Sequence, residues 1–499
     1  MKPVKQLAGQ TVIYGLSTIV PRFLNFLLVP LYTWFFPIEE YGVITELYAY
    51  AIFLNIVLTY GMETAFFKFS QDNTNTNKIY STILYTILSS SLVFAAITFL
   101  FASPISSLIQ YDRNPEYIWI FGLIISIDAI CSIPFVRLRK ENKAFRFAFI
   151  KLANVCINVI LNLCFILLFP WLLKKGVSLP LWLYNPSIGL GYIFYSNLVA
   201  SIFTLLIVSP QISFKGGFDA SLLKKILAYS LPLLVAGFAG SINEALDRIL
   251  IKHLLPENVN AMGQLGIYGA NFKLAILLVL FIQTFRFAAE PFFFNYEKEK
   301  DSKVLFSRIL NYFTVIILII FLGTLSNLDV LKYFIGPKFW EGLYLVPILL
   351  FANVFLGIYM YLSSWYKLAG QTMYGAYIVG IGAGLTVAVN LIFVPLYGIV
   401  ASAYGHLISY FVMTIVCYFW GRKYYPIPYE IGKLVKYIVL AIIFTGVILL
   451  LPIETIWLRL IVFNSILLIF AYILLKNVGL INVLKASIPF LKRKETVLK

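Results

Sequence analysis

Long apolar stretches separated by short polar breaks dominate the chain. Runs of about 18 to 26 apolar residues are long enough to cross a bilayer as single helices. They predict fourteen spanning helices, near residues 12–36, 42–66, 79–103, 117–136, 147–172, 188–208, 226–251, 264–289, 309–327, 343–364, 374–394, 397–420, 436–452 and 456–475. The pattern therefore predicts an all-α polytopic membrane protein.

Composition supports this class and argues against a nucleic-acid partner. Hydrophobic residues make up 61% of the 499 residues, and charged residues only 12%, about half the share usual in soluble proteins. The net charge of +17 comes from Lys and Arg residues spread over many short loops. Nucleic-acid binding proteins instead concentrate such residues in one domain or stripe.

The basic residues also predict an orientation. Most of them fall in one alternating set of polar segments, which includes the N-terminus with Lys2 and Lys5, "RLRKENKAFR" from Arg137, and "LKRKE" near the C-terminus. Cytoplasmic loops carry the excess of Lys and Arg in membrane proteins. An even number of spans then places both termini in the cytoplasm.

The loops leave no room for an additional enzymatic domain. The longest outer loop runs from about Lys174 to Ser187, and no phosphate-binding GxxxxGK[ST] motif occurs. The two histidines, His253 and His406, are too few and too far apart for a zinc site. We therefore expect no catalytic residue, no metal and no cofactor, which argues against a membrane glycosyltransferase or polysaccharide polymerase.

Four landmarks recur in the same order in the two halves of the chain. "YGVITEL" from Tyr41 matches "YGANFKL" from Tyr268, "NLCF" from Asn162 matches "NLIF" from Asn390, and the latter register sets Arg139 against Lys367. "PSIGLGYIFYSNL" and "PLYGIVASAYGHL" share the pattern Pro-x-x-Gly followed by Tyr and Leu. These matches predict a six-helix unit used twice in the same direction, with a cavity between the lobes. The predicted lobes are residues 1–215 and 216–425, followed by two additional helices and a basic tail in 426–499.

The whole chain resembles the polysaccharide flippase branch of the multidrug/oligosaccharidyl-lipid/polysaccharide exporter (MOP) superfamily. The resemblance rests on "GQTVIYGLSTIVPRFLNFLLVPLYTWFFPIEEYG", on "SLPLLVAGFAGSINEALDRILI" and on the basic stretch after the fourth span. It implies alternating access through a cationic cavity between two lobes. It also implies transfer of an undecaprenyl-diphosphate-linked oligosaccharide to the outer leaflet of the bacterial inner membrane, for surface polysaccharides such as O-antigen in lipopolysaccharide. Membrane lipids, a polysaccharide polymerase and its chain-length machinery are the implied partners.

Basic residues inside the spans are the candidates for binding a diphosphate. Charged residues in hydrocarbon are costly, so they usually face a cavity or a partner. Arg22 lies near the middle of the first span, and Lys273 and Arg248 lie in the eighth and seventh. Arg offers paired donors to phosphate oxygens, and Lys offers a mobile point charge. We expect these three residues to bind the diphosphate, with snorkelling towards the interface as the alternative for Arg248.

Acidic residues inside the spans are the candidates for ion coupling or gating, since no ATPase is present. They are Glu46, Glu63, Asp128, Glu244 and Asp247. Glu46 matches Lys273 in the repeat, so an ion pair between them is the structural alternative. Glu244 and Arg248 can pair on one helix face, whereas Asp247 points about 100° away from Arg248. Lys151, Arg286 and Glu290 lie near the cytoplasmic interface, where anchoring explains them.

Two related functions compete with polysaccharide flipping. A cation-coupled multidrug exporter would need acidic cavities with little fixed positive charge, and the first span carries Arg22 but no Asp or Glu. A flippase for peptidoglycan precursors shares the topology and the cationic site, although the first two spans hold few basic residues for that branch.

Overall fold

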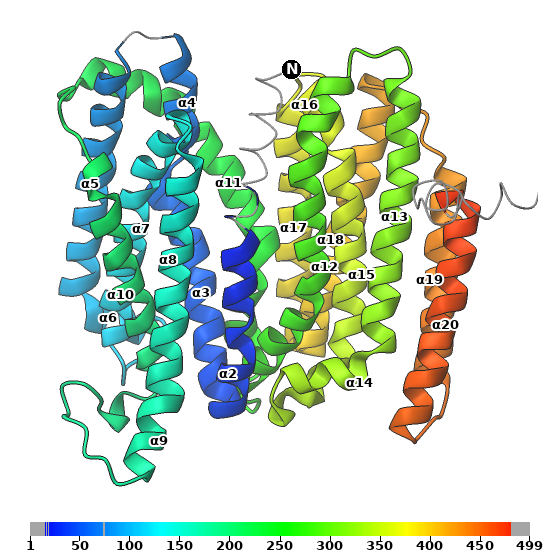
Figure 1. Cartoon of the computed structure of the whole chain (residues 1–499), viewed down its shortest axis with the longest axis horizontal. Helices are drawn as coiled ribbons and strands as arrows, with labels where there is room; N and C mark the ends of the chain where they lie inside the picture. The colour runs from blue at the N-terminus through cyan, green and yellow to red at the C-terminus, as the bar shows by residue number, and fades with distance from the viewer. Residues whose placement is uncertain (1–14, 16, 18, 73–74, 481–499) are drawn as a thin grey trace, which may run out of the picture. The chain divides into compact units, whose positions relative to one another are not determined.

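The computed structural model describes residue 15, residue 17 and residues 19–72 and 75–480. All regular elements in these ranges are helical, which confirms the predicted fold class (Figure 1). Thirteen helices are long and apolar enough to cross a membrane, and a shorter apolar helix covers Ile19–Phe35. This shorter helix corresponds to the first predicted span, whose beginning lies outside the described residues.

Contacts divide the chain into two compact units. The first unit comprises Met1–Gly269 and Asn390–Ile399, and the second comprises Ala270–Val389 and Val400–Lys499. The boundary between the units falls inside α12, after the start of the second predicted repeat. The two units are defined by contacts in space, whereas the predicted lobes are defined by a repeat in the sequence. The lobe boundaries therefore stay a prediction.

In the described part of the chain, the first unit contains the α-helices α2 to α11. Their bounds are α2 Leu28–Phe35, α3 Ile38–Thr59, α4 Met62–Asp72, α5 Thr76–Leu100, α6 Ala102–Leu108, α7 Glu116–Lys140, α8 Ala144–Leu163, α9 Phe169–Lys174, α10 Gly191–Val208 and α11 Ala220–Leu254. Helix α7 packs against α3, α5 and α10, and α10 also packs against α8. These helices form the neighbouring set that Figure 1 labels α5, α7, α8 and α10.

The second unit contains most of α12 and the helices that follow it. Their bounds are α12 Ala261–Tyr296, α13 Ser302–Ser326, α14 Leu328–Leu331, α15 Leu345–Leu362, α16 Ser364–Leu368, α17 Met373–Tyr397, α18 Ile399–Tyr424, α19 Ile431–Leu450 and α20 Ile456–Asn477. The two additional C-terminal helices, α19 and α20, both pack on α13. Arg459 at the start of α20 donates to both carboxylate oxygens of Asp329, at 3.2 and 3.0 Å, and holds α20 in place.

Glycines in the repeated "YG" motif allow the beginning of α12 to approach α3 closely. A Cβ on Gly42 would lie 2.2 Å from the Met262 carbonyl oxygen, and a Cβ on Gly266 would lie 1.9 Å from the Ile38 carbonyl oxygen. A Cβ on Gly269 would meet the Thr45 hydroxyl oxygen at 2.4 Å. Small residues permit such backbone contact between membrane helices. The motif therefore has a packing role within the first unit.

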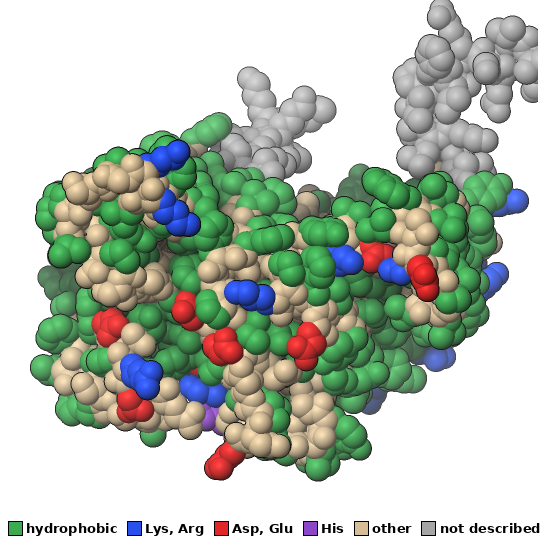
Figure 2. All heavy atoms as spheres, turned by 90° about the horizontal axis from the view of Figure 1, so that it is seen from below, with side chains coloured by type: hydrophobic (Ala, Val, Ile, Leu, Met, Phe, Trp, Pro, Cys, Tyr) green, Lys and Arg blue, Asp and Glu red, His purple; other side chains and the backbone are tan. Residues whose placement is uncertain are grey.

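Many large apolar side chains are exposed along the helices, as expected for a protein surrounded by lipid. In the view of Figure 2, hydrophobic side chains predominate, and charged side chains occur singly or in small groups.

Candidate functional site

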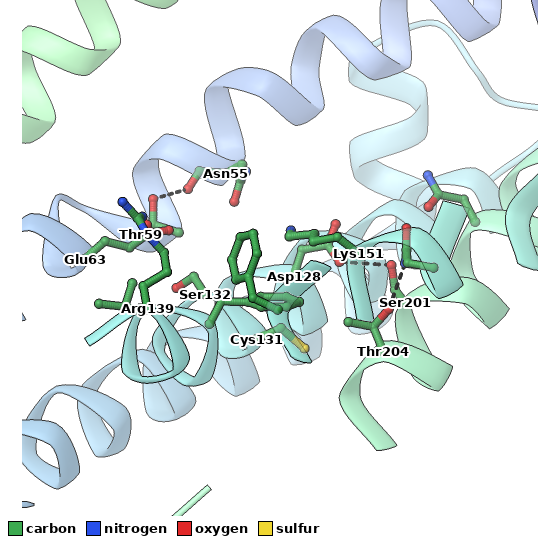
Figure 3. Close-up of a pocket in the computed structure, with 15 residues that line it drawn as sticks. Asn55, Thr59, Glu63, Asp128, Cys131, Ser132, Arg139, Lys151, Ser201 and Thr204 are labelled. Atoms are coloured by element: carbon green, nitrogen blue, oxygen red, sulfur yellow. Dashed lines mark hydrogen bonds between the residues drawn. The ribbon is translucent and has the colours of Figure 1, made fainter. Parts of the chain in front are cut away.

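A polar cavity of about 300 Å³ lies inside the first unit (Figure 3). It is lined by α3, α4, α7, α8 and α10, and its charged lining residues are Glu63, Asp128, Arg139 and Lys151. Neutral polar residues complete the lining: Asn55, Thr59, Ser132, Asn154, Asn197, Ser201 and Thr204. We call this set the polar cavity. Two acids and two bases in one membrane-spanning bundle balance each other's formal charge.

A break between α3 and α4 positions Glu63. Tyr60 and Gly61 both have positive φ, 28° and 73°, which interrupts one long apolar segment. Glycine tolerates this conformation because it lacks a Cβ. Glu63 follows in the first turn of α4, where the positive end of a helix dipole favours a negative charge. Figure 3 shows Glu63 on the same side of the cavity as Thr59 and Arg139.

Asp128 lies midway along α7, at the other side of the polar cavity. Its Oδ1 accepts a hydrogen bond of 2.9 Å from the Ser201 hydroxyl of α10 (Figure 3). The Asp128 side chain is exposed to the space within the bundle, whereas its neighbours Ser126 and Ala129 are buried. Asp128 is therefore a carboxylate with accessible surface towards a cavity, in the middle of a membrane-spanning helix.

Lys151 of α8 faces Asp128 across the polar cavity. Its Nζ lies 4.2 Å from the centroid of the Phe135 ring, a cation–π contact. Figure 3 shows Asp128, Lys151 and Ser201 close together. The half-buried Lys151 thus supplies positive charge beside the carboxylate instead of anchoring the helix at the membrane surface.

A stripe of polar residues on α8 leads from the polar cavity towards the first apolar helix. Asn154 donates to Thr204 at 2.8 Å inside the cavity. Further along α8, Asn158 donates to Asn25 at 3.4 Å, and Asn162 accepts from Tyr32 at 3.0 Å. Residues spaced by three or four positions share a helix face. The stripe therefore connects the cavity with the helix Ile19–Phe35, which also carries Arg22.

A second charged cluster is buried in the first unit. Lys252 Nζ lies 3.2 Å from Glu46 Oε2, and the two side chains are only 5% and 0% exposed. The Tyr111 hydroxyl donates to the same carboxylate oxygen. Burial, followed by the charge of Glu46, raises the pKa of Tyr111, so the hydroxyl keeps its proton. A buried pair of this kind is costly to break from one side.

The repeat register relates the polar cavity to a pocket in the second unit. Glu63, Thr59 and Asn55 correspond to Glu290, Arg286 and Ile282, and Arg139 corresponds to Lys367. These counterparts line a space of only about 20 Å³ that is filled by aromatic rings, and we call it the aromatic pocket. Its aromatic lining residues are Phe285, Phe293, Phe313 and Tyr361. Within it, Lys367 forms an ion pair with Glu290.

Comparison with known families identifies the class of the chain. The sequence pattern of the polysaccharide biosynthesis protein family matches residues 35–343. The chain belongs to this family. Among curated proteins, none matches the chain significantly.

Solved structures share the fold of this family member. The lipid II flippase MurJ in an inward closed conformation matches with a TM-score of 0.71 and 15% sequence identity, over 93% of this chain and 99% of that chain. The inward-facing conformation of a multidrug resistance MATE family transporter of the MOP superfamily matches with a TM-score of 0.60 and 16% identity, over 85% and 96%. The outward-facing conformation of such a transporter gives 0.54 and 16%, over 83% and 95%. The chain is thus a multi-pass membrane protein with the fold of MOP transporters.

The structure of this family member separates the acidic candidates into three groups. Glu63 and Asp128 lie together in the polar cavity. Glu46 is buried with Lys252. Asp247 is buried on α11 and accepts a hydrogen bond of 2.5 Å from Tyr268, whereas Glu244 on the same helix is exposed.

The basic candidates differ in their exposure. Arg22 is exposed, and Arg248 and Lys273 are half-buried. Arg22 and Arg248 belong to the first unit and Lys273 to the second. Their joint role in binding a diphosphate stays a prediction.

Sequence reasoning missed Lys151 and Lys252 as functional or buried charges. Lys151 was assigned to the interface because it lies near one end of its span. Lys252 lies just past the predicted end of the seventh span, although α11 continues to Leu254. The regular spacing of Lys151, Asn154, Asn158 and Asn162 along one helix face was the signal that could have revealed the polar stripe.

Among the described residues, no group of three or more His, Cys, Asp or Glu could hold a metal ion.

Proposed function

We propose that this protein flips an undecaprenyl-diphosphate-linked oligosaccharide from the cytoplasmic to the outer leaflet of the bacterial inner membrane. The family match carries this proposal, because it connects the chain with polysaccharide biosynthesis, which the fold alone does not. Likeness to a lipid II flippase supports a lipid-linked form of that substrate. Both termini would then lie in the cytoplasm, in accord with the distribution of Lys and Arg.

Arg22, Arg248 and Lys273 are the proposed diphosphate ligands. The exposure of Arg22 on a helix that must cross apolar surroundings supports this role, since intramembrane charge usually faces a cavity or a partner. Arg binds phosphate oxygens through paired donors, which Lys cannot do. We expect the sugar to contact neutral polar groups. Related proteins could then differ in the sugar that they accept.

The polar cavity is the proposed coupling site. Asp128 can take up a proton or a cation from the aqueous space of the cavity, and Glu63 provides a second carboxylate there. When Asp128 is neutralised, the balance with Lys151 and Arg139 changes by one unit of charge. The polar stripe on α8 would carry the resulting shift to Asn25 and Tyr32, and so to the helix of Arg22.

Gating is the proposed role of the remaining acids. The buried pair of Glu46 and Lys252 joins α3 to the end of α11, and Asp247 joins α11 to the beginning of α12 through Tyr268. Both contacts tie helices together near their ends. A change between the inward-open and outward-open states would have to move these ends. Glu244, exposed on α11, is the third candidate.

A cation-coupled multidrug exporter is the alternative function. The fold likeness to MATE transporters and the two acids of the polar cavity favour it. However, Arg139 and Lys151 balance the two acids, so the cavity lacks the excess of negative charge that an organic cation would need. We therefore favour the anionic lipid-linked substrate. A flippase for peptidoglycan precursors is the closer alternative, because its substrate is also a diphosphate.

Reconstitution tests the proposal directly. Purified protein in liposomes with a fluorescent undecaprenyl-diphosphate oligosaccharide should transfer the label between leaflets without forming a new glycosidic bond, and it should not export organic cations. Arg22→Ala should abolish transfer at normal protein level. Normal transfer by Arg22→Ala would discard the cationic site. Formation of a glycosidic product would discard the flippase, and equal transfer of a lipid II analogue would favour the peptidoglycan branch.

A further inference from the structure

A separate pocket in the second unit combines fixed charge with a buried hydrogen-bond acceptor that has no donor among the described residues. It has a volume of about 420 Å³ and lies between α13, α19 and the end of α20. Its polar lining residues are Ser307, Arg308, Asn311, Tyr312, Glu430, Lys433 and Asn477. We call it the headgroup pocket. None of these residues takes part in the polar cavity or in the proposed diphosphate site.

The headgroup pocket carries one unit of net positive charge. Lys433 Nζ lies 2.6 Å from Glu430 Oε1, so these two charges neutralise each other. The Lys433 ammonium is the main cause that lowers the pKa of Glu430, which keeps the carboxylate ionised. Arg308 is exposed to the pocket and forms no ion pair within the described part of the chain. The pocket is therefore suited to a ligand with a single negative charge.

The pocket also contains one buried acceptor that has no donor among the described residues. Asn311 is only 5% exposed, and its Nδ2 donates to Glu430 Oε2. Its Oδ1 is buried and accepts no hydrogen bond within the described residues. An orphaned buried acceptor is costly, so such groups are usually paired. A ligand with hydroxyl groups would satisfy Asn311 Oδ1.

The helices beside the pocket face lipid. Exposed apolar side chains continue along α19 and α20, among them Val435, Val439 and Ile442 on α19 and Leu468 and Ile469 on α20. A ligand that reaches the pocket from this side can lay acyl chains against them. Basic pockets between membrane helices are known to bind anionic lipid headgroups.

We propose that the headgroup pocket binds one phospholipid with a phosphoglycerol headgroup. Arg308 contacts the phosphodiester, and the glycerol hydroxyls donate to Asn311 Oδ1 and to Glu430. The bound lipid fills the junction between the two C-terminal helices and α13, and so fixes these helices to the second unit. This site does not depend on the transported substrate, so its test is separate from the test of the proposed function.

Native mass spectrometry of the full-length protein tests the site. After incubation with phosphatidylglycerol or with phosphatidylcholine of equal chain length, the wild type should retain one phosphatidylglycerol in preference. Arg308→Gln should weaken this retention by about fivefold, and the control Arg422→Gln, with the same charge change outside the pocket, should leave it unchanged. Glu430→Gln should strengthen retention, because Lys433 is then no longer neutralised and the pocket gains one unit of positive charge, while the amide oxygen can still accept from a glycerol hydroxyl.

Three outcomes would overturn the proposal. Equal retention of both lipids would show that the headgroup is not recognised. Loss of retention in both Arg308→Gln and Glu430→Gln, together with lowered melting temperatures, would show that the charges stabilise the helix junction and do not recognise the headgroup. Displacement of the lipid by free glycerol phosphate at equal concentration would make the ligand a soluble phosphate ester.

Discussion

The polar cavity of the first unit and the aromatic pocket of the second unit are lined by residues that correspond to each other in the predicted repeat, but the two spaces differ in content. Glu63 and Arg139 have counterparts of the same charge in Glu290 and Lys367, whereas Asp128 and Lys151 correspond to Leu356 and Val379. The first space has a volume of about 300 Å³ and the second about 20 Å³. In the predicted repeat, an acid and a base at helix ends are thus common to both units, whereas Asp128 in the middle of α7 and Lys151 in the first half of α8 are particular to the first unit.

This difference suggests a division of labour. Glu290 and Lys367 are paired with each other, and aromatic rings fill the space beside them, so there is little room for an ion or water. Asp128 and Lys151 line an open space with many neutral polar groups. We therefore assign ion coupling to the first unit alone and a structural role to the pair in the second.

The largest effect is expected from replacing Asp128 by leucine, the residue type at the corresponding position 356 of the second unit. Asp128→Leu should lower leaflet transfer by at least about tenfold, or ~1.4 kcal/mol in activation free energy, because the group that takes up the ion is lost. The reciprocal change Leu356→Asp should not restore transfer in this background. Unchanged transfer by Asp128→Leu, measured in proteoliposomes, would end the assignment of coupling to this cavity.

The two glutamates provide a matched pair. Glu63→Gln should reduce transfer several-fold, because it leaves the two bases of the polar cavity with a single acid. Glu290→Gln should alter transfer less than twofold and lower the free energy of unfolding by no more than about 1 kcal/mol, since the ion pair with Lys367 is partly exposed. Equal effects of both substitutions on the transfer rate would contradict a difference between the units.

Lys151 and Asp128 should depend on each other for stability. Lys151→Val should lower the free energy of unfolding by roughly 1 to 3 kcal/mol, because it leaves an excess of negative charge inside the bundle. Adding Asp128→Asn should recover most of this loss while transfer stays low. Thermal denaturation in detergent measures both variants, and additive losses in the double variant would show that the two residues do not interact.

A half-buried carboxylate outside the spans should give the smallest effect. Asp219 accepts a hydrogen bond of 3.0 Å from the Leu222 amide at the start of α11 and lies 2.7 Å from Lys78 Nζ. The Lys78 contact is the main cause that holds the pKa of Asp219 below its ordinary value. Its stabilising contribution is therefore present above about pH 4 and is lost as the pH falls through the lowered folded-state pKa.

Asp219→Asn serves as the control for acid sensitivity. This variant should be slightly less stable at neutral pH and should lose less stability on acidification than the wild type. Melting curves between neutral and acidic pH measure the difference. A parallel pH dependence in the two proteins would mean that Asp219 does not contribute.

The sequence was sufficient to predict the fold class and, among the described residues, the thirteen helices that are long enough to cross a membrane. Glu63 and Asp128 stood out because charge is rare in hydrocarbon, and both line the polar cavity. The partners of Glu46 and Asp247 could not be predicted, because Lys252 and Tyr268 are brought to them by tertiary packing. Lys151 was assigned to the interface because it lies near the end of its span. The distance from a helix end does not reveal whether a side chain points towards a cavity or away from it. The small volume of the aromatic pocket depends on side-chain packing, which a residue pattern does not contain.

Leaflet transfer by the wild type and by Asp128→Asn, with and without an imposed proton or sodium gradient, tests the central claim most directly. Asp128→Asn keeps the volume of the side chain and removes only its charge, so the cavity should remain intact. We predict that a gradient accelerates the wild type and leaves the Asp128→Asn variant at its basal rate, while Glu290→Gln still responds like the wild type. Acceleration of the Asp128→Asn variant by the same gradient would contradict coupling through the polar cavity.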